Sequence, residues 1–83
     1  MIYPVVCVRD AKTGFYPPQI EQNLMSAKRN FAMMINNSEG VVGYAPNDFD
    51  FYYVADFDSE KGEMIPVCPI EQLATGVGVF NEK

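Results

Sequence analysis

The sequence predicts a small α+β domain, in which a mainly antiparallel sheet of three to four strands is covered by one amphipathic helix. The chain has 83 residues, enough for one domain and too few for a second core. One segment repeats apolar residues at helical spacing, and the other apolar runs are short, β-branched or aromatic, and bounded by turn residues. We expect the order strand, helix, short strand, strand, strand, with residues 1–83 as a single domain whose tail, from about residue 70, is less strongly patterned.

The first strand is predicted at residues 2–9, Ile-Tyr-Pro-Val-Val-Cys-Val-Arg, because β-branched and apolar residues suit a largely buried strand. Pro4 has no backbone N–H and therefore belongs near the strand start or on an edge. Residues 10–14 form a turn in which Gly14 is free to take a positive φ. Residues 15–18 then continue as an extended, stiff segment because they end in two prolines.

A helix is predicted at residues 23–36, with Asn23 as a good N-cap. Its apolar residues recur at spacings of three and four and form one stripe, which we expect to cover the sheet. The stripe consists of Leu24, Ala27, Phe31, Met34 and Ile35. Residues 36–40 end the helix, since Asn37 or Gly40 can adopt the left-handed conformation.

The second half of the chain is predicted to supply the rest of the sheet. Residues 41–44 are a short strand or an irregular link, residues 45–48 are a turn, and residues 49–57 are the central strand. Alternate residues of a strand point to the same face, and we place the fully apolar or aromatic face of this strand against the helix. That face carries Phe51, Tyr53, Ala55 and Phe57.

A hairpin is expected to join the central strand to the last one through a loop at residues 58–62 that ends in glycine. The partner strand, at residues 63–68, contains Pro66, which confines it to an edge or a bulge. Exposed sheet edges commonly pair with a second copy of the chain, so we expect a homodimer.

The tail is predicted to leave the sheet. Pro69 ends the last strand, and residues 69–74 can form one helical turn because proline suits the first turn of a helix. Gly76-Val77-Gly78 is too short for a phosphate-binding loop and has no helix to open, so we interpret it as a flexible tail. The apolar residues around it suggest that the tail packs or pairs.

Composition excludes several kinds of site. The chain has no histidine, which rules out a His-based metal site and the Ser–His and Cys–His pairs of nucleophilic enzymes. Its formal charge is −5, with +2 in residues 1–30 and −7 in residues 31–83, whereas a nucleic-acid binder usually has a basic domain. No apolar run approaches the ~20 residues that span a bilayer, and no signal peptide opens the chain, so we expect no membrane contact.

Cys7 and Cys68 are too few for a disulfide framework or for a zinc site made of thiolates. We interpret both as small buried residues on strands in a reducing cytosol. A bridge between them is possible only if their strands are neighbours.

The acidic residues near the hairpin do not match a calcium loop. Counted from Asp56, such a loop needs glycine in its sixth place and glutamate in its twelfth, where this chain has Lys61 and Val67. Asp48 and Asp50 have no nucleophile, electrophile or pocket to accompany them, so we expect no enzyme, no metal and no cofactor. We interpret as a solvated hairpin tip the residues Asp56, Asp58, Glu60 and Glu63.

The best nucleic-acid candidate is a group of basic and aromatic side chains in the first part of the chain. Single-stranded DNA binding needs cations along a groove and aromatic faces for stacking. The group consists of Arg9, Lys12, Phe15, Tyr16, Lys28 and Arg29. Its members converge only if the first loop folds over the helix; otherwise the cations are scattered surface charges and the aromatics cover the core.

Two stretches have the order and spacing of a known family. The first runs Arg9-Asp10-Ala11-Lys12-Thr13-Gly14-Phe15-Tyr16 and continues with Pro18, Asn23, Ala27, Arg29 and Phe31. The second runs Pro46-Asn47-Asp48-Phe49, then Phe51-Tyr52, Asp56-Phe57-Asp58 and Gly62. In these residues the chain resembles, from Met1 to about Pro69, the small nonstructural protein of gokushoviruses, which are single-stranded DNA phages of the Microviridae. It departs from the family at Ala55, where glycine is frequent, and its tail beyond Cys68 matches less clearly.

The resemblance implies a phage protein that is made in the host bacterial cytoplasm and is absent from the mature particle. It implies a role in genome replication or in single-stranded DNA synthesis and packaging, with viral replication or procapsid proteins as partners. Some relatives are labelled DNA-binding, but the charge of −5 fits that label poorly, so we expect a non-enzymatic protein that acts mainly through protein contacts. The alternatives are a single-stranded DNA-binding protein that uses the basic and aromatic group, and a factor that acts on a host protein.

Overall fold

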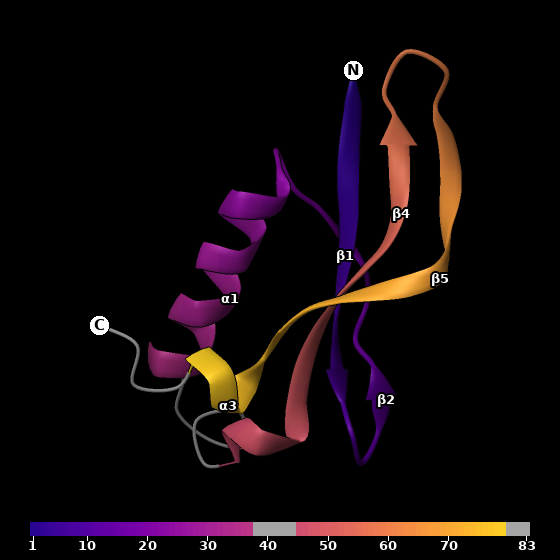
Figure 1. Ribbon diagram of the computed structural model, residues 1–83. Coiled ribbons are helices and arrows are strands. Elements are labelled where there is room, and N and C mark those ends of the chain that lie inside the picture. Colours follow the sequence, from indigo (N-terminus) through magenta and orange to yellow (C-terminus); the bar gives the residue numbers. More distant parts are fainter. Residues whose placement is uncertain (38–44, 80–83) are drawn as a thin grey trace.

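A computed structural model describes residues 1–37 and 45–79 of the chain. It confirms the predicted fold class, because a curled, antiparallel sheet carries one long helix (Figure 1). The elements are β1 (Ile2–Asp10), β2 (Gly14–Phe15), β3 (Gln19–Ile20), α1 (Leu24–Asn37), η1 (Pro46–Asp48), β4 (Phe49–Asp58), β5 (Glu63–Thr75) and α3 (Gly76–Val79).

The sheet is built around β1 and β4. Its strand order is β2-β1-β4-β5, and the short β3 also pairs with β1. Every pairing is antiparallel. β5 is therefore an edge strand, as the proline in its sequence predicted.

The N-terminal predictions agree closely with the structure. β1 covers the predicted strand, and Gly14 in the following turn has a φ of +103°. The carboxylate of Asp10 accepts a hydrogen bond from the backbone N–H of Lys12 at 2.9 Å, which holds the turn. The extended segment beyond this turn supplies β2 and β3, which pair with β1.

α1 begins after the predicted cap, since the Asn23 side-chain oxygen accepts the N–H of Ser26 at 2.8 Å. The predicted stripe faces the sheet, and the Phe31 ring stacks on that of Phe51 with 4.7 Å between centroids. The buried cluster comprises Val6, Ala27, Phe31, Ile35, Phe49 and Phe51. This core lies at one end of the β4–β5 hairpin, and the other end of the hairpin projects past α1 (Figure 1).

The prediction that one face of β4 packs on the helix along its whole length is wrong. Tyr53 pairs with Val6 whereas Ala55 pairs with Val5, so Val54 is an extra residue in a bulge. Val5 and Val6 are neighbours in β1 and point to opposite faces, so their partners Ala55 and Tyr53 also point to opposite faces. Tyr53 consequently lies on the α1 side of the sheet, and Ala55 and Phe57 lie on the other side.

The predicted end of the last strand is also wrong. β5 does not stop at Pro69 but continues to Thr75. Residues 69–74, for which a helical turn was predicted, are therefore part of the strand. Gly76–Val79 is not a flexible tail: it forms the helical turn α3, in which Gly76 is buried and Val79 packs against the core. Pairing of residues 71–75 with β4 overrides the local preference of proline for a helix start.

Two expectations fall on residues 38–44, which lie outside the described residues. They are the end of the helix beyond Asn37 and the short strand or link at residues 41–44.

Candidate functional site

The outer half of the β4–β5 hairpin projects from the core and offers two different faces. Cross-strand partners share a face, so the pairs Asp58–Glu63 and Asp56–Ile65 lie on the α1 side, next to Ile2 of β1. Glu71 pairs with Tyr53 and lies on the same side. We call this surface the acidic face; it consists of Asp56, Asp58, Glu63 and Glu71, with Ile2 and Ile65 between them.

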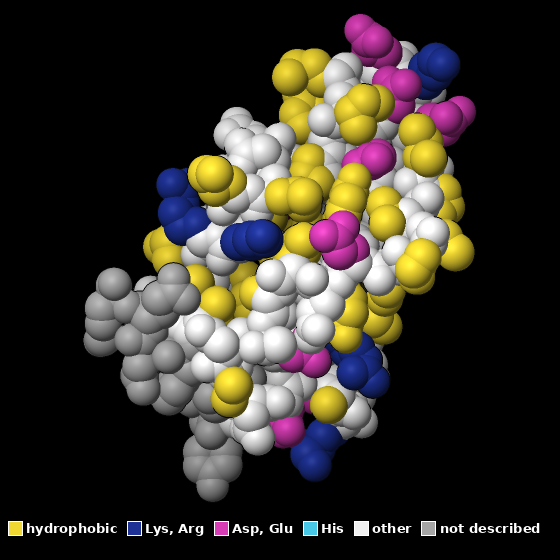
Figure 2. Space-filling model, in the orientation of Figure 1, with side chains coloured by type: hydrophobic (Ala, Val, Ile, Leu, Met, Phe, Trp, Pro, Cys, Tyr) yellow, Lys and Arg dark blue, Asp and Glu magenta, His cyan; other side chains and the backbone are white. Residues whose placement is uncertain are grey.

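The acidic face concentrates the negative charge of the chain. Residues 49–75 contain six carboxylates and one lysine, Lys61, which gives a formal charge of −5. Figure 2 shows acidic side chains running from the hairpin tip toward the middle of the molecule, with hydrophobic side chains among them. Ile2 and Ile65 are 54% and 42% exposed, so large apolar groups meet solvent within this charged surface.

The hairpin tip is held by Asp58. Its carboxylate accepts backbone N–H bonds from Glu60 at 3.0 Å and Lys61 at 3.3 Å. Of the four residues interpreted as a solvated tip, Glu60 and Glu63 are exposed, whereas Asp56 and Asp58 are half-buried and accept hydrogen bonds. Gly62 has a φ of +66°, a conformation that glycine adopts without strain. Within the described residues, no group of three or more His, Cys, Asp or Glu is arranged to hold a metal ion.

Tyr53 and Asp56 are linked across the bulge, because the phenol donates a hydrogen bond to the Asp56 carboxylate. This bond, burial, and the charges of Asp56 and Glu71 together raise the pKa of Tyr53 to about 12. The phenol is protonated at neutral pH, as an ordinary tyrosine is, and it acts as a donor that links the two sides of the bulge at Val54.

The opposite side of the sheet is uncovered by α1 and is aromatic. Phe57 pairs with Tyr3 and with Met64, and farther down Tyr52 pairs with Cys7, so these residues share the side away from the helix. Phe15 pairs with Arg9 on the same side and meets Tyr52 edge to face, with 5.6 Å between centroids. We call this surface the open face; its residues are Tyr3, Arg9, Phe15, Tyr52, Phe57 and Met64.

The six predicted nucleic-acid residues are divided among three places. Arg9 and Phe15 lie together on the open face, where the guanidinium carbon stands 5.9 Å from the ring centroid, and Lys12 is exposed in the adjoining turn. Tyr16 lies on the other side of the sheet, where it meets Phe49 edge to face at 6.1 Å. Lys28 and Arg29 are exposed on α1, away from the first loop. Figure 2 shows basic side chains over α1 and, separately, near the β1–β2 turn.

Sequence reasoning missed Tyr52, which completes the aromatic group with Arg9 and Phe15. Alternation in β4 indicates that Tyr52 faces away from Phe51, but only the pairing with Cys7 places it beside the first loop. Sequence reasoning also missed that Met64, Ile65 and Ile70 of β5 are exposed. The available signal was the prolines of this strand, because proline is confined to the edge of a sheet.

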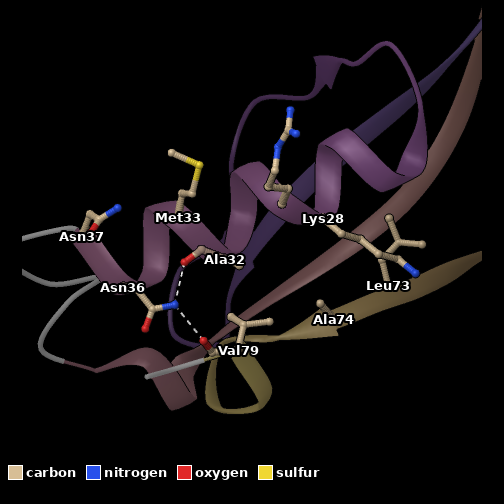
Figure 3. A pocket seen from close by; sticks show the side chains of 9 residues that line it. Lys28, Ala32, Met33, Asn36, Asn37, Leu73, Ala74 and Val79 are labelled. Carbon is tan, nitrogen blue, oxygen red and sulfur yellow. Dashed lines mark hydrogen bonds between the residues drawn. The ribbon is translucent and has the colours of Figure 1, made fainter. Parts of the chain in front are cut away.

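A groove of about 570 Å³ lies between α1, the end of β5 and α3 (Figure 3). Lys28 and Arg29 line it together with apolar side chains such as Met33 and Leu73. Asn36 also lines the groove, and its amide donates hydrogen bonds to the carbonyl oxygens of Ala32 at 2.8 Å and Val79 at 2.7 Å.

The two thiols are free and lie in different environments. β4 separates β1 from β5, so the strands of Cys7 and Cys68 are not neighbours and the alternative of a bridge is excluded. Cys7 is buried, as predicted, and burial raises the pKa of its thiol. The prediction that Cys68 is buried is wrong, because the outer side of β5 has no covering element in the described structure.

No helix in the described part of the chain is long and apolar enough to cross a membrane.

Comparison with known proteins identifies the family of the chain. A family model described as Phage ORF5 protein matches residues 3–79. This range contains α1 and every strand of the two faces, except for Ile2, the first residue of β1. No curated protein and no solved structure matches the chain. Because the match extends over nearly the whole sequence, the chain belongs to the Phage ORF5 protein family.

Proposed function

We propose that this phage protein is a non-enzymatic accessory factor that acts in viral genome replication, or in the synthesis and packaging of single-stranded DNA, by binding other viral proteins in the host bacterial cytoplasm. Membership of a phage protein family supports a viral role. The observation that carries the proposal is the acidic face, where Ile2 and Ile65 are exposed among carboxylates.

Exposed apolar residues in this position favour a protein partner. The outer hairpin contributes no side chain to the buried cluster around Phe31, so folding of the core does not depend on Ile65. Apolar groups that meet solvent beyond the core are typical of interaction surfaces. The charge of −5 on residues 49–75 repels phosphates, which disfavours nucleic acid on this side of the molecule.

The test is to introduce Ile65→Ser into the phage genome and to count packaged genomes per infected cell. Loss of one buried isoleucine weakens a contact by about 1.5–3 kcal/mol, or about tenfold or more, so we expect fewer packaged genomes. Met25→Ser is the control, because Met25 is an exposed apolar residue on α1 and lies on neither face of the sheet.

Capture of the tagged chain from infected cells identifies the partner. Recovery of a viral replication or procapsid protein by the native chain, and its loss with Ile65→Ser, is the expected result. An Ile65→Ser phage that packages normally, or a capture that yields one host protein through the same residue, contradicts the proposal.

Single-stranded DNA binding is the second candidate, favoured by one specific contact. Arg9, Phe15 and Tyr52 meet on the open face, and a cation beside exposed aromatic rings is the arrangement on which unpaired bases stack. This side of the sheet faces away from the carboxylates of the acidic face.

Fluorescence anisotropy with a labelled single-stranded oligonucleotide tests this candidate. Phe15→Ala is expected to remove about 1–3 kcal/mol of stacking energy, and Arg9→Ala to reduce the slope of affinity against salt by about one unit. Arg29→Ala removes the same charge from α1 and serves as the control. If Arg9→Ala and Arg29→Ala weaken binding equally, the open face is not the DNA site.

A further inference from the structure

The groove between α1, the end of β5 and α3 follows the axis of the helix (Figure 3). The described residues of α1 that line it recur at spacings of four and therefore form two rows along one side of the helix. The rows are Lys28, Ala32, Asn36 and Arg29, Met33, Asn37. A helix rises by about 14 Å over this stretch, so the groove is elongated.

The wall opposite α1 is apolar. It consists of Leu73 and Ala74 at the end of β5 and Val79 of α3, all half-buried, and we call it the apolar wall. The same three residues also line a second hollow of about 430 Å³. Apolar surface that continues beyond the groove suits a peptide, because a small-molecule site encloses most of its ligand.

The groove is positively charged, although the chain as a whole has a charge of −5. Lys28 and Arg29 are both exposed, and within the described residues neither pairs with a carboxylate. Among the described residues that line the groove, none is acidic. A partner that carries carboxylates is therefore attracted to this groove and repelled by the acidic face.

We propose that the groove binds an acidic, amphipathic segment of a partner protein, whose carboxylates meet Lys28 and Arg29 and whose apolar side chains lie against the apolar wall. The inference goes beyond the proposed function, because it assigns a second surface that is opposite in charge to the acidic face. An amphipathic helix that enters a groove presents apolar side chains at spacings of three and four. The length of this groove accommodates about two and a half turns of such a helix.

A nucleic acid fits the groove less well than a peptide. Sites for single-stranded DNA combine cations with aromatic rings on which bases stack, and the described lining of the groove contains no aromatic residue. A strand longer than the groove also approaches Glu71 and the other carboxylates of the acidic face, which lie on the α1 side of the sheet. Its phosphates are repelled there.

An NMR titration of the isotope-labelled full chain with two synthetic peptides tests the proposal. The first peptide is an amphipathic helix with leucines at spacings of three and four and glutamates elsewhere, and the second has lysines in place of the glutamates. We expect the acidic peptide to shift the amide signals of Ala32, Leu73 and Val79, and the basic peptide to leave them unchanged. High salt is expected to weaken the binding, because both cations are exposed.

Charge reversal in the groove is the first variant. Lys28→Glu combined with Arg29→Glu is expected to raise the Kd of the acidic peptide by at least about tenfold, since like charges then meet. Lys12→Glu combined with Lys61→Glu is the matched control, because it makes the same change of charge at exposed positions outside the groove.

Filling the groove is the second variant. Ala32→Tyr places a ring between Lys28 and Asn36 and is expected to raise the Kd of the acidic peptide by at least about tenfold, with no change of charge. Met25→Tyr adds the same ring at a position of α1 that is 83% exposed, and it is expected to leave the Kd unchanged.

An acidic peptide that leaves the signals of the groove unchanged overturns the proposal, as does equal weakening by the two charge variants. The same shifts on raising the protein concentration without peptide would assign the groove to a second copy of the chain, and the same shifts with a single-stranded oligonucleotide would assign it to DNA. Either result also overturns the proposal. The phage experiment with Ile65→Ser does not involve the groove, so the proposed function and this inference can fail separately.

Discussion

Phe31 is the side chain through which the helix is fixed on the sheet. It is 3% exposed, and its ring lies parallel to that of Phe51, within 7°. Ala27 and Ile35, one turn before and one turn after it, are also buried. Helical spacing predicted this stripe because each of its members faces the same side of α1.

At this scale we expect Phe31→Ala to lower the free energy of unfolding by about 3–5 kcal/mol, since it removes a buried ring and leaves a cavity. Chemical denaturation with helix content as the probe measures the change. Met25→Ala, on the solvent side of the same helix, is expected to change stability by less than about 0.5 kcal/mol. Similar costs for the two changes would mean that the stripe is not the packing face.

At the scale of elements, α3 is held by hydrogen bonds with side chains of α1 and β5. Asn36 on α1 donates to the carbonyl oxygen of Val79, and Thr75 accepts the N–H of Gly78 through its hydroxyl at 2.9 Å. These contacts convert a glycine-rich stretch into the turn α3. Asn36 and Val79 are 43 residues apart, whereas Thr75 and Gly78 are 3 residues apart. Only the bond between Thr75 and Gly78 can be predicted from neighbouring residues of the sequence.

We expect Asn36→Ala to destabilise the α1–α3 contact by about 1 kcal/mol, because a hydrogen bond between elements is lost. Amide hydrogen exchange in residues 74–79 should become faster while exchange in β1 is unchanged. Asn37→Ala is the control, since it makes the same change in helix propensity at an exposed neighbouring position. Unchanged exchange at the end of β5 in Asn36→Ala would show that Val79 is held by apolar packing alone.

At the scale of the whole molecule, β1 is the strand that the rest of the sheet surrounds. It pairs with β4 on one side and with β2 and β3 on the other, and residues on both of its faces are buried at its centre. Cys7 stands at this centre, whereas Cys68 is exposed on the outer strand. The reactivity of Cys7 therefore reports unfolding of the whole sheet, whereas Cys68 is accessible in the native protein.

We expect a thiol reagent to modify Cys68 rapidly in the native protein and Cys7 only after unfolding. Burial blocks access to Cys7, and its raised pKa lowers the thiolate fraction that reacts. In a Cys68→Ser variant, the labelling rate of Cys7 against denaturant should follow the unfolding transition measured by circular dichroism. Rapid labelling of Cys7 in native buffer would contradict the burial of this thiol at the centre of the sheet.

The sequence by itself determined the elements whose cause is local. The spacing of Leu24, Phe31 and Ile35 predicts α1, Asn23 predicts its start, and glycines predict the turns at Gly14 and Gly62. Each of these signals depends on residues within a few positions of one another, so no knowledge of the rest of the chain is required.

Only the tertiary structure decided which faces the strands present and where the last strand ends. The bulge at Val54 moves Phe57 to the side opposite Phe51, and pairing with β4 keeps residues 71–75 extended in spite of Pro69. The same pairings bring Arg9, Phe15 and Tyr52 together and leave Lys28 and Arg29 apart. These outcomes depend on the register between strands that are distant in sequence, and a shift of one residue in register exchanges the two faces of a strand.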